Sequence, residues 1–313
     1  MKVEEKYRYL FGPVPSRRLG LSLGVDLNPV KVCTENCVFC QIGRTTELTM
    51  ARQEWVPTVE VLAEFDRWHA AGRRTDYVTL SGSGEPTMHT GFGEVLRHVK
   101  ATSSFRTALL SNGSLFWMPE VRRDAAEADV VKVTLSAWDE DSFRRIHRPA
   151  EGLMFPRLLE GERMFRNEFA GLLWVEVMLL PGFNDAPAQV KAIAALANSL
   201  QANAIHLNTT TRPARAGLKV PRVPEAWLRT VATWFSPEAE IPVFAGRSVS
   251  PLDMSDAALL ELLARHPLAL DAMAASSGAD LAAVERRLAP LVAAGQLAVE
   301  EHHGERMVRV NRP

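Results

Sequence analysis

The chain has 313 residues, of which 47% are hydrophobic and 23% charged, and its formal net charge is −1. This ordinary globular composition supplies enough apolar material for a sizeable core. It excludes a global basic field that would attract nucleic acid, although 29 of the 36 basic residues are arginines.

No apolar run is long enough for a transmembrane helix, and the first residues, MKVEEKYRYLFG, lack the apolar stretch of a secretory signal. The chain has only three cysteines, so it cannot form the balanced disulfide framework of a small secreted fold. We therefore expect a soluble, cytoplasmic protein without a membrane partner.

From about residue 20 to 245, apolar runs of strand length alternate with amphipathic runs of helix length. The predicted strands cover residues 21–27, 77–82, 106–111, 130–137, 172–180, 204–210 and 241–246. The predicted helices cover residues 58–71, 91–101, 118–127, 139–147, 156–168, 186–201 and 224–235. Repeated strand–helix units indicate parallel strands joined by right-handed crossovers, and near-continuous apolar strands indicate a sheet covered on both faces. A doubly wound α/β sheet and a partial α/β barrel both fit, and in both the active site lies beyond the carboxyl ends of the strands.

The composition changes near residue 252, where a smaller region begins. It contains a predicted hairpin with the turn HHGE and three predicted helices, at 255–265, 268–276 and 280–294. Three helices followed by a β-ribbon is the order of a winged helix, so we expect domains at 1–250 and 251–313. The smaller region has nine acidic residues and six arginines, a net charge of −3. Such a module suits docking of a protein or peptide, or capping of the larger domain, as well as it suits nucleic-acid binding.

The three cysteines, Cys33, Cys37 and Cys40, share one short segment, CTENCVFC. Their close spacing argues for a metal or a cluster. A structural zinc site usually has four ligands, so zinc would have to recruit a histidine from elsewhere, and a purely electron-transferring 4Fe–4S centre would need a fourth cysteine. Three thiolates on a 4Fe–4S cluster leave one iron without a protein ligand, which suits a catalyst that binds a small molecule.

The Cx3Cx2C pattern, with Phe39 before the third cysteine, resembles that of radical S-adenosylmethionine (SAM) enzymes. The resemblance implies a partial (β/α)6 TIM-like barrel, a 4Fe–4S cluster on the three cysteines, and SAM as cofactor. It also implies that the reduced cluster cleaves SAM to methionine and a 5′-deoxyadenosyl radical, which removes a hydrogen atom from substrate. An external donor of flavodoxin or ferredoxin type would supply the electron.

A second motif, SGSGEPT, occupies residues 81–87 at the end of the next predicted strand. Its glycines would let backbone approach a ligand closely, and a carboxylate before a rigid proline would be fixed against an amine. The motif resembles the family's glycine-rich segment that receives the methionyl amino group of SAM, and a plain strand-to-helix loop is the alternative. The resemblance assigns SAM binding to Gly82, Ser83, Gly84, Glu85 and Pro86.

Further candidate SAM contacts end the third and fourth predicted strands. Ser111 and Asn112 contact SAM by resemblance, or else form only a turn that leads into a helix. Lys132, Thr134 and Ser136 share one face of their strand because strand side chains alternate. We expect Ser136 at a ribose hydroxyl and Lys132 in an ion pair with a carboxylate in the barrel floor.

The remaining candidates lie on the fifth strand and in loops. Met178 occupies the place where such enzymes contact adenine, with a core position as the alternative. Four loop arginines would approach the barrel mouth and suit a phosphate or carboxylate, unless they are ordinary surface residues of an arginine-rich chain. They are Arg17, Arg18, Arg148 and Arg212.

Segments 11–31, 143–149 and 207–213 together resemble the wyosine-synthetase-related Fe–S oxidoreductase branch of radical SAM proteins. Characterised members build a tricyclic guanosine in phenylalanine tRNA with a second iron–sulfur cluster, for which this chain has no cysteines left. It also carries Ser136 where relatives tend to have an aspartate. The resemblance implies a nucleoside or tRNA-related substrate. The alternatives are a peptide or protein substrate, and a non-catalytic redox regulator that binds DNA through the winged helix.

Overall fold

The computed structural model describes residues 7–16, 18–28, 31–210, 221–242, 254–265, 267–302 and 304–311. Its main feature is a seven-stranded sheet in the order β1-β2-β5-β6-β7-β8-β9. These strands are β1 (Leu10–Ser16), β2 (Gly20–Val25), β5 (Tyr77–Leu80), β6 (Arg106–Leu110), β7 (Val130–Thr134), β8 (Leu172–Met178) and β9 (Ala204–Asn208). Neighbouring strands from β2 to β9 pair in parallel, whereas β1 pairs antiparallel with β2 at one edge.

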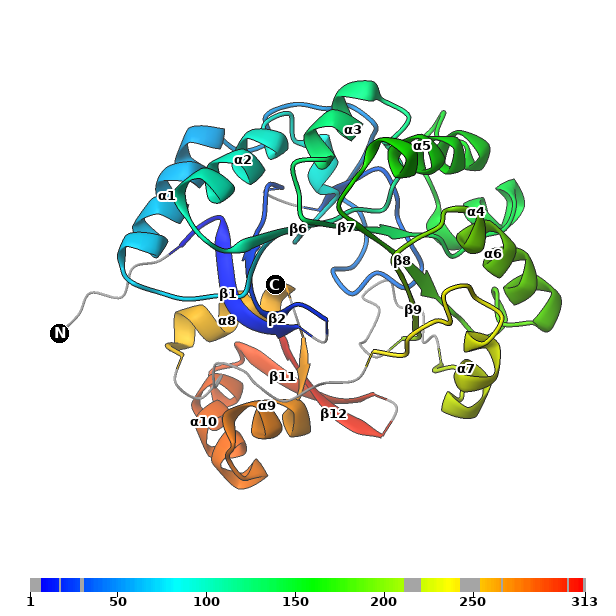
Figure 1. The fold of residues 1–313 in the computed structure, drawn as a ribbon. Helices are drawn as coiled ribbons and strands as arrows, with labels where there is room; N and C mark the ends of the chain where they lie inside the picture. Colours follow the sequence, from blue (N-terminus) through cyan, green and yellow to red (C-terminus); the bar gives the residue numbers. More distant parts are fainter. Residues whose placement is uncertain are drawn as a thin grey trace.

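Helices connect the parallel strands and lie along the outer, convex side of the curved sheet (Figure 1). They are α1 (Thr58–Ala70), α2 (Phe92–Thr102), α3 (Pro119–Ala125), α4 (Glu140–His147), α5 (Phe155–Glu168), α6 (Pro187–Ser199) and α7 (Glu225–Ala232). The strands follow one another in chain order, whereas a doubly wound sheet reverses its order at a switch point. The mostly parallel sheet is therefore consistent with a partial barrel.

The predicted strands from 21–27 to 204–210 are confirmed, and each ends one to three residues earlier than expected. Of the predicted strand at 241–246, residues 241 and 242 are described and form no strand, and residues 243–246 lie outside the described residues. Strand β1 was not predicted, because its sequence LFGPVPS contains a glycine and two prolines. Proline is tolerated on an edge strand, and the pairing with β2 shifts register between Phe11 and Val14 to accommodate this sequence.

The two faces of the sheet differ in polarity. On β8, Leu173, Val175 and Val177 are fully buried in the core between the sheet and the helices. The intervening residues Glu176 and Met178 line a cavity on the inner face. Burial therefore alternates along β8, whereas all four residues of β5 are buried, so the expectation of a sheet covered on both faces holds for β5 and not for β8.

The C-terminal region forms three helices and a three-stranded antiparallel sheet in the order β10-β12-β11. Its elements are α8 (Asp256–Arg265), β10 (Leu268–Ala269), α9 (Leu270–Ser277), α10 (Leu281–Ala293), β11 (Leu297–His302) and β12 (Glu305–Val310). The three predicted helices and the hairpin are confirmed, although α9 begins two residues later than predicted because the short strand β10 precedes it. The predicted domain boundary after residue 250 lies outside the described residues.

This C-terminal module contacts the larger domain at two places. Helix α8 packs on β1, and Val14 of β1 belongs to the module's own hydrophobic core. Beyond β9, Arg222 forms a two-pronged ion pair with Glu305 of β12, with nitrogen–oxygen distances of 3.1 and 2.9 Å. The module therefore packs on β1 at one edge of the sheet and, through Glu305, contacts Arg222 in the segment that leads into α7. In the described parts of the chain, no helix combines the length and the apolar character that a membrane span requires.

Candidate active site in the barrel cavity

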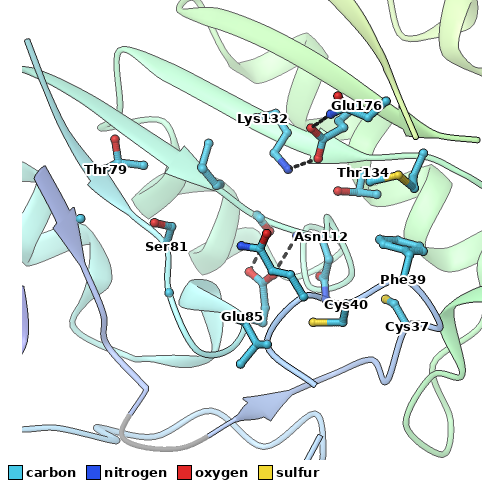
Figure 2. A pocket seen from close by; sticks show the side chains of 18 of the residues that line it. Cys37, Phe39, Cys40, Thr79, Ser81, Glu85, Asn112, Lys132, Thr134 and Glu176 are labelled. Atoms are coloured by element: carbon cyan, nitrogen blue, oxygen red, sulfur yellow. Dashed lines mark hydrogen bonds and ion pairs between the residues drawn. The ribbon is translucent and has the colours of Figure 1, made fainter. Parts of the chain in front are cut away.

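The inner face of the sheet encloses a cavity of about 390 Å³. The cysteine loop, the glycine-rich loop and the seven strands of the large sheet all contribute to its walls (Figure 2). Among the predicted site residues, those that line it are Cys33, Cys37, Cys40, Gly82, Gly84, Glu85, Ser111, Asn112, Thr134 and Met178. The structure thus brings most of the candidates from five separate segments to one place.

The cysteine loop is held by backbone hydrogen bonds to the segment that ends α4. Asn36 N donates to the carbonyl of His147 at 2.9 Å, and Val38 N donates to that of Ile146 at 3.0 Å. Val38 and Ile146 are both fully buried and pack together in a small apolar cluster. The segment at 143–149, which the sequence marks as distinctive, therefore supports the loop that carries the thiols.

Burial controls the chemistry of the thiols. It raises the pKa of Cys33 and of Cys37, and the nearby carboxylate of Glu35 raises both pKa values further. At neutral pH these thiols are therefore protonated unless a bound metal ionises them. All three cysteines are free of disulfides.

The spacing of the sulfur atoms distinguishes a single ion from a larger group. Zinc bound at about 2.3 Å would hold its thiolate sulfurs about 3.8 Å apart. Among the described residues, one group of three potential metal ligands has all its ligand atoms within 4.8 Å of one another, and it consists of Glu35, Cys37 and His147. The three cysteine sulfurs do not form such a group, so they do not all lie within that distance of one another. Three thiols around a wider space fit a cluster of several irons better than one ion.

Glu35 and His147 form a buried pair beside Cys37. The His147 Nδ1 atom lies 2.9 Å from Glu35 Oε2 and 3.5 Å from Cys37 Sγ. A zinc interpretation would require such a histidine, and His147 could not be singled out from the sequence because it lies 110 positions from Cys37. Phe39 packs edge-on against its ring, with centroids 5.7 Å apart.

The glycine-rich loop packs directly on the segment that leads into the cysteines. A Cβ atom at Gly84 would lie 1.8 Å from the carbonyl oxygen of Val32, and one at Gly82 would lie 2.4 Å from the carboxyl carbon of Asp26. Glu85 N donates to that same Val32 carbonyl at 3.1 Å. We predicted that these glycines make room for a ligand. In the structure they are required because the backbone here packs against the segment that leads into the cysteines, so the prediction is incomplete.

Glu85 is the best-anchored acid at the site. Its carboxylate is 2% exposed and accepts hydrogen bonds from Thr87 N, Thr87 Oγ1, Ser111 Oγ and Asn112 N, at 2.6–3.1 Å. Burial raises its pKa, and these four hydrogen bonds oppose that shift. They also fix the orientation of the carboxylate, which Figure 2 shows at the wall of the cavity.

Three predicted SAM contacts do not line the cavity. Ser83 donates its hydroxyl to Asp26 at 2.7 Å, and Pro86 is buried at the start of a short 3-10 helix. Ser136 is fully buried, and its hydroxyl accepts a hydrogen bond from Met178 N at 2.9 Å. Strand β7 ends at Thr134, so the alternation of side chains that placed Ser136 at the cavity does not continue to that position, and its contact with SAM stays a prediction.

The floor of the cavity contains a group of charges. Lys132 Nζ lies 2.7 Å from Glu176 Oε2, which confirms the predicted ion pair. Arg18 Nη2 lies 2.6 Å from Glu176 Oε1, and Asn208 Nδ2 donates to the same oxygen at 2.5 Å. Glu176 and Asn208 were not identified from the sequence, although a single acid inside the apolar strand LLWVEVM was a usable signal.

The four candidate arginines do not share one location in the structure. Arg18 lines the cavity, but it reaches it from the amino-terminal end of β2 rather than from the mouth. Arg148 is exposed and does not line the cavity. Arg17 and Arg212 lie outside the described residues.

Comparison with known proteins shows which family and which relatives this chain is similar to. Residues 27–192 match the family model of the Radical SAM superfamily. A UPF0026 protein of Helicobacter pylori is 34% identical over 271 residues, which cover 84% of this chain and 85% of that protein. A protein named GTPase Obg of Brachyspira hyodysenteriae is 28% identical over 99% of this chain, which spans only 46% of that relative.

Solved structures show the same fold. A radical SAM methyltransferase from Sphaerobacter thermophilus superposes with a TM-score of 0.50 and 21% identity. The match covers 71% of this chain and 64% of the methyltransferase. At this identity the likeness concerns the arrangement of the α/β core alone.

Proposed function

Because the chain belongs to the Radical SAM superfamily, we propose that it cleaves SAM reductively at a single 4Fe–4S cluster bound by Cys33, Cys37 and Cys40, and acts on a nucleoside or tRNA-related substrate. Members of this superfamily use a 4Fe–4S cluster and SAM as cofactors, and this chain is an enzyme of that kind. When bound, the reduced cluster supplies the electron that breaks a carbon–sulfur bond of SAM.

One observation carries the proposal: Asn112 connects the cysteine loop to the glycine-rich loop. Its side-chain amide donates to Thr34 Oγ1 at 2.8 Å and lies 3.8 Å from Cys33 Sγ. Its backbone N donates to Glu85 Oε2 at 2.7 Å. A ligand at Asn112 is therefore placed between the thiols and the Glu85 carboxylate.

The residues of the chain have separate roles in this proposal. Glu85 Oε1 accepts three of the four hydrogen bonds from described residues, so Oε2 keeps capacity for a further donor. An ammonium group such as the amino group of SAM is the donor that a fixed, buried carboxylate favours. Thr134 and Met178, on the strands β7 and β8, provide the wall that faces the rest of the bound cofactor.

The substrate part of the proposal rests on the resemblance in three segments. Each contributes to the cavity or its support: Arg18 comes from segment 11–31, the cysteine loop rests on segment 143–149, and Asn208 comes from segment 207–213. We retain an external electron donor of flavodoxin or ferredoxin type. The relatives give no support to a DNA-binding redox regulator, which we do not propose.

A peptide or protein substrate is the second candidate, and the C-terminal module favours it. Its element order, helix, strand, two helices and two strands, is the basis on which we propose a winged helix at 251–313. Val292 and Val299 are exposed apolar residues in a shallow groove of this module, beside Glu285. Binding of a basic peptide to the full chain, and loss of that binding in Val299→Ser, would favour this candidate over a nucleoside.

The proposal is tested by anaerobic reconstitution of the full chain with iron and sulfide, followed by dithionite and SAM. We expect about four irons per chain and formation of 5′-deoxyadenosine in the wild type, and neither in Cys37→Ala. A loaded protein that does not bind SAM would contradict the proposal. Comparison of modified nucleosides in tRNA from deletion and parent strains tests the substrate part separately, and unchanged tRNA would turn attention to peptides.

A further inference from the structure

The charges in the cavity floor are not balanced. Arg18 and Lys132 both contact one carboxylate, that of Glu176, so the group carries a net charge of +1. Burial opposes ionisation of Glu176, but the two cations outweigh it and hold its pKa well below the ordinary value. Glu176 is therefore charged at neutral pH and offsets one of the two cations, which leaves the charge of the other unbalanced.

A buried net charge is unfavourable unless an opposite charge accompanies it. The side chains of Lys132 and Glu176 are 11% and 14% exposed, so bulk water compensates for little of this excess. Arg18 Nε is buried and has no hydrogen-bond acceptor among the described residues. The Lys132 ammonium has three N–H donors, of which the structure assigns one, to Glu176. Both cations thus retain donors that an additional anion would satisfy.

The opposite wall of the cavity has the other sign. Glu35 and Glu85 line it together with the three cysteines, which become thiolates when they bind a metal. Figure 2 shows Lys132 and Glu176 directed toward each other, apart from the loop that carries Cys37 and Cys40. An anion entering the cavity is therefore repelled from the cysteine side and attracted to the floor.

We propose that Arg18 and Lys132 bind a carboxylate or phosphate group of the substrate, and that this contact turns the rest of the substrate toward the cysteine loop. The inference rests on the proposed function for the identity of the reacting side. Arg18 supplies a planar pair of donors and Lys132 a compact charge, and both arrangements suit an oxyanion. Glu176 is a positioning residue, which holds the two cations at one spacing and leaves them donors that no described residue accepts.

The experiment measures oxyanion binding to the reconstituted full chain by fluorine NMR. Monofluorophosphate and fluoroacetate serve as separate probes, because one represents a phosphate group and the other a carboxylate. Line broadening at constant ionic strength reports binding of each. The variants are Lys132→Met, which makes the floor neutral, and Glu176→Gln, which raises its charge to +2. Lys100→Met is the matched control, since Lys100 pairs with Asp129 at 3.4 Å on the outer surface and is 42% exposed.

We expect at least one probe to broaden with the wild type and with Lys100→Met. Binding should weaken by about tenfold or more in Lys132→Met, as for the loss of one charge-assisted hydrogen bond, and should be retained or tightened in Glu176→Gln. The probe that broadens identifies phosphate or carboxylate as the substrate group. Equal broadening in the wild type and Lys132→Met, or none with either probe, would overturn the inference.

Formation of 5′-deoxyadenosine is measured on the same wild-type samples. The test of SAM cleavage is then independent of the test of the anion site. SAM cleavage without probe binding would refute only the anion site. Probe binding to a loaded chain that never binds SAM would refute the proposed function and leave the anion site standing. Thermal unfolding of each variant without probe checks that Lys132→Met remains folded, as expected because Arg18 and Asn208 still donate to Oε1 of Glu176 and Arg18 still offsets its charge.

Discussion

The rim and the floor of the cavity are formed by different parts of the chain. The rim, defined as Cys33, Cys37, Cys40 and Glu85, follows the carboxyl ends of β2 and β5. The floor, defined as Arg18, Lys132 and Glu176, comes from the middle of β7 and β8 and from the residues before β2. The rim carries three thiols and a buried acid, whereas the floor carries an excess of positive charge. Under the two proposals, the rim would carry out the chemistry of the reaction and the floor would select the substrate.

The largest effect is expected for Gly84→Ala, which tests whether the rim is one packed unit. The new methyl group would lie 1.8 Å from a backbone oxygen, which cannot move as a flexible side chain does. We expect destabilisation of more than about 4 kcal/mol or a displaced cysteine segment, with loss of iron loading in either case. Gly72→Ala is the control, because a Cβ there meets nothing within 4 Å and only the left-handed backbone resists it. Normal iron content in Gly84→Ala would show that the two rim loops are independent.

Glu176→Gln tests the floor through its pH dependence. Removal of the charge leaves Arg18 and Lys132 without their common partner, at a cost of about 3–5 kcal/mol at neutral pH. Because the pKa of Glu176 is depressed in the folded chain, its stabilising effect is present above the unfolded value of about 4.3 and is lost as the pH falls below it. Urea unfolding should therefore show a gap between wild type and variant that is widest at pH 7 and narrows toward acid. A constant gap would mean that packing, and not charge, explains the loss.

The fold was largely predictable from the sequence, because each parallel strand is an apolar run and each helix has its own amphipathic period. The rim was predictable for a different reason: the cysteines and the glycine-rich loop are contiguous motifs of fixed spacing. The floor was not, since Arg18, Glu176 and Asn208 meet only when distant strands pair, and no local pattern records that pairing. The orientation of Ser136 was not predictable, because a sequence does not show at which residue an alternating strand ends.

Glu85→Gln tests whether the rim and the floor bind their ligands independently, by comparing the affinity for SAM with the affinity for oxyanions. An amide supplies an NH2 group where the carboxylate now accepts hydrogen bonds, and it removes the charge that an ammonium group would contact. We expect SAM to bind about tenfold to a hundredfold more weakly, as for the loss of a hydrogen bond to a charged group. Binding of the fluorinated oxyanions should be unchanged or slightly stronger. A loss of oxyanion binding as large as the loss of SAM binding would show that rim and floor are not separate sites.

The smallest effect is expected for Ser136→Ala, at the position that the sequence assigned to SAM and the structure assigns to the framework. Its hydroxyl accepts from Met178 N at 2.9 Å, so its removal leaves one buried donor without a partner and should cost about 1–3 kcal/mol of unfolding free energy. SAM affinity, measured by equilibrium binding to the loaded protein, should change less than about twofold, because the side chain does not face the cavity. Thr134→Ala, on the cavity-lining residue two positions earlier, is the matched comparison and should affect SAM more than stability. If Ser136→Ala instead weakened SAM binding and left stability intact, the rim would extend beyond the end of β7, and the sequence-based assignment of Ser136 would be restored.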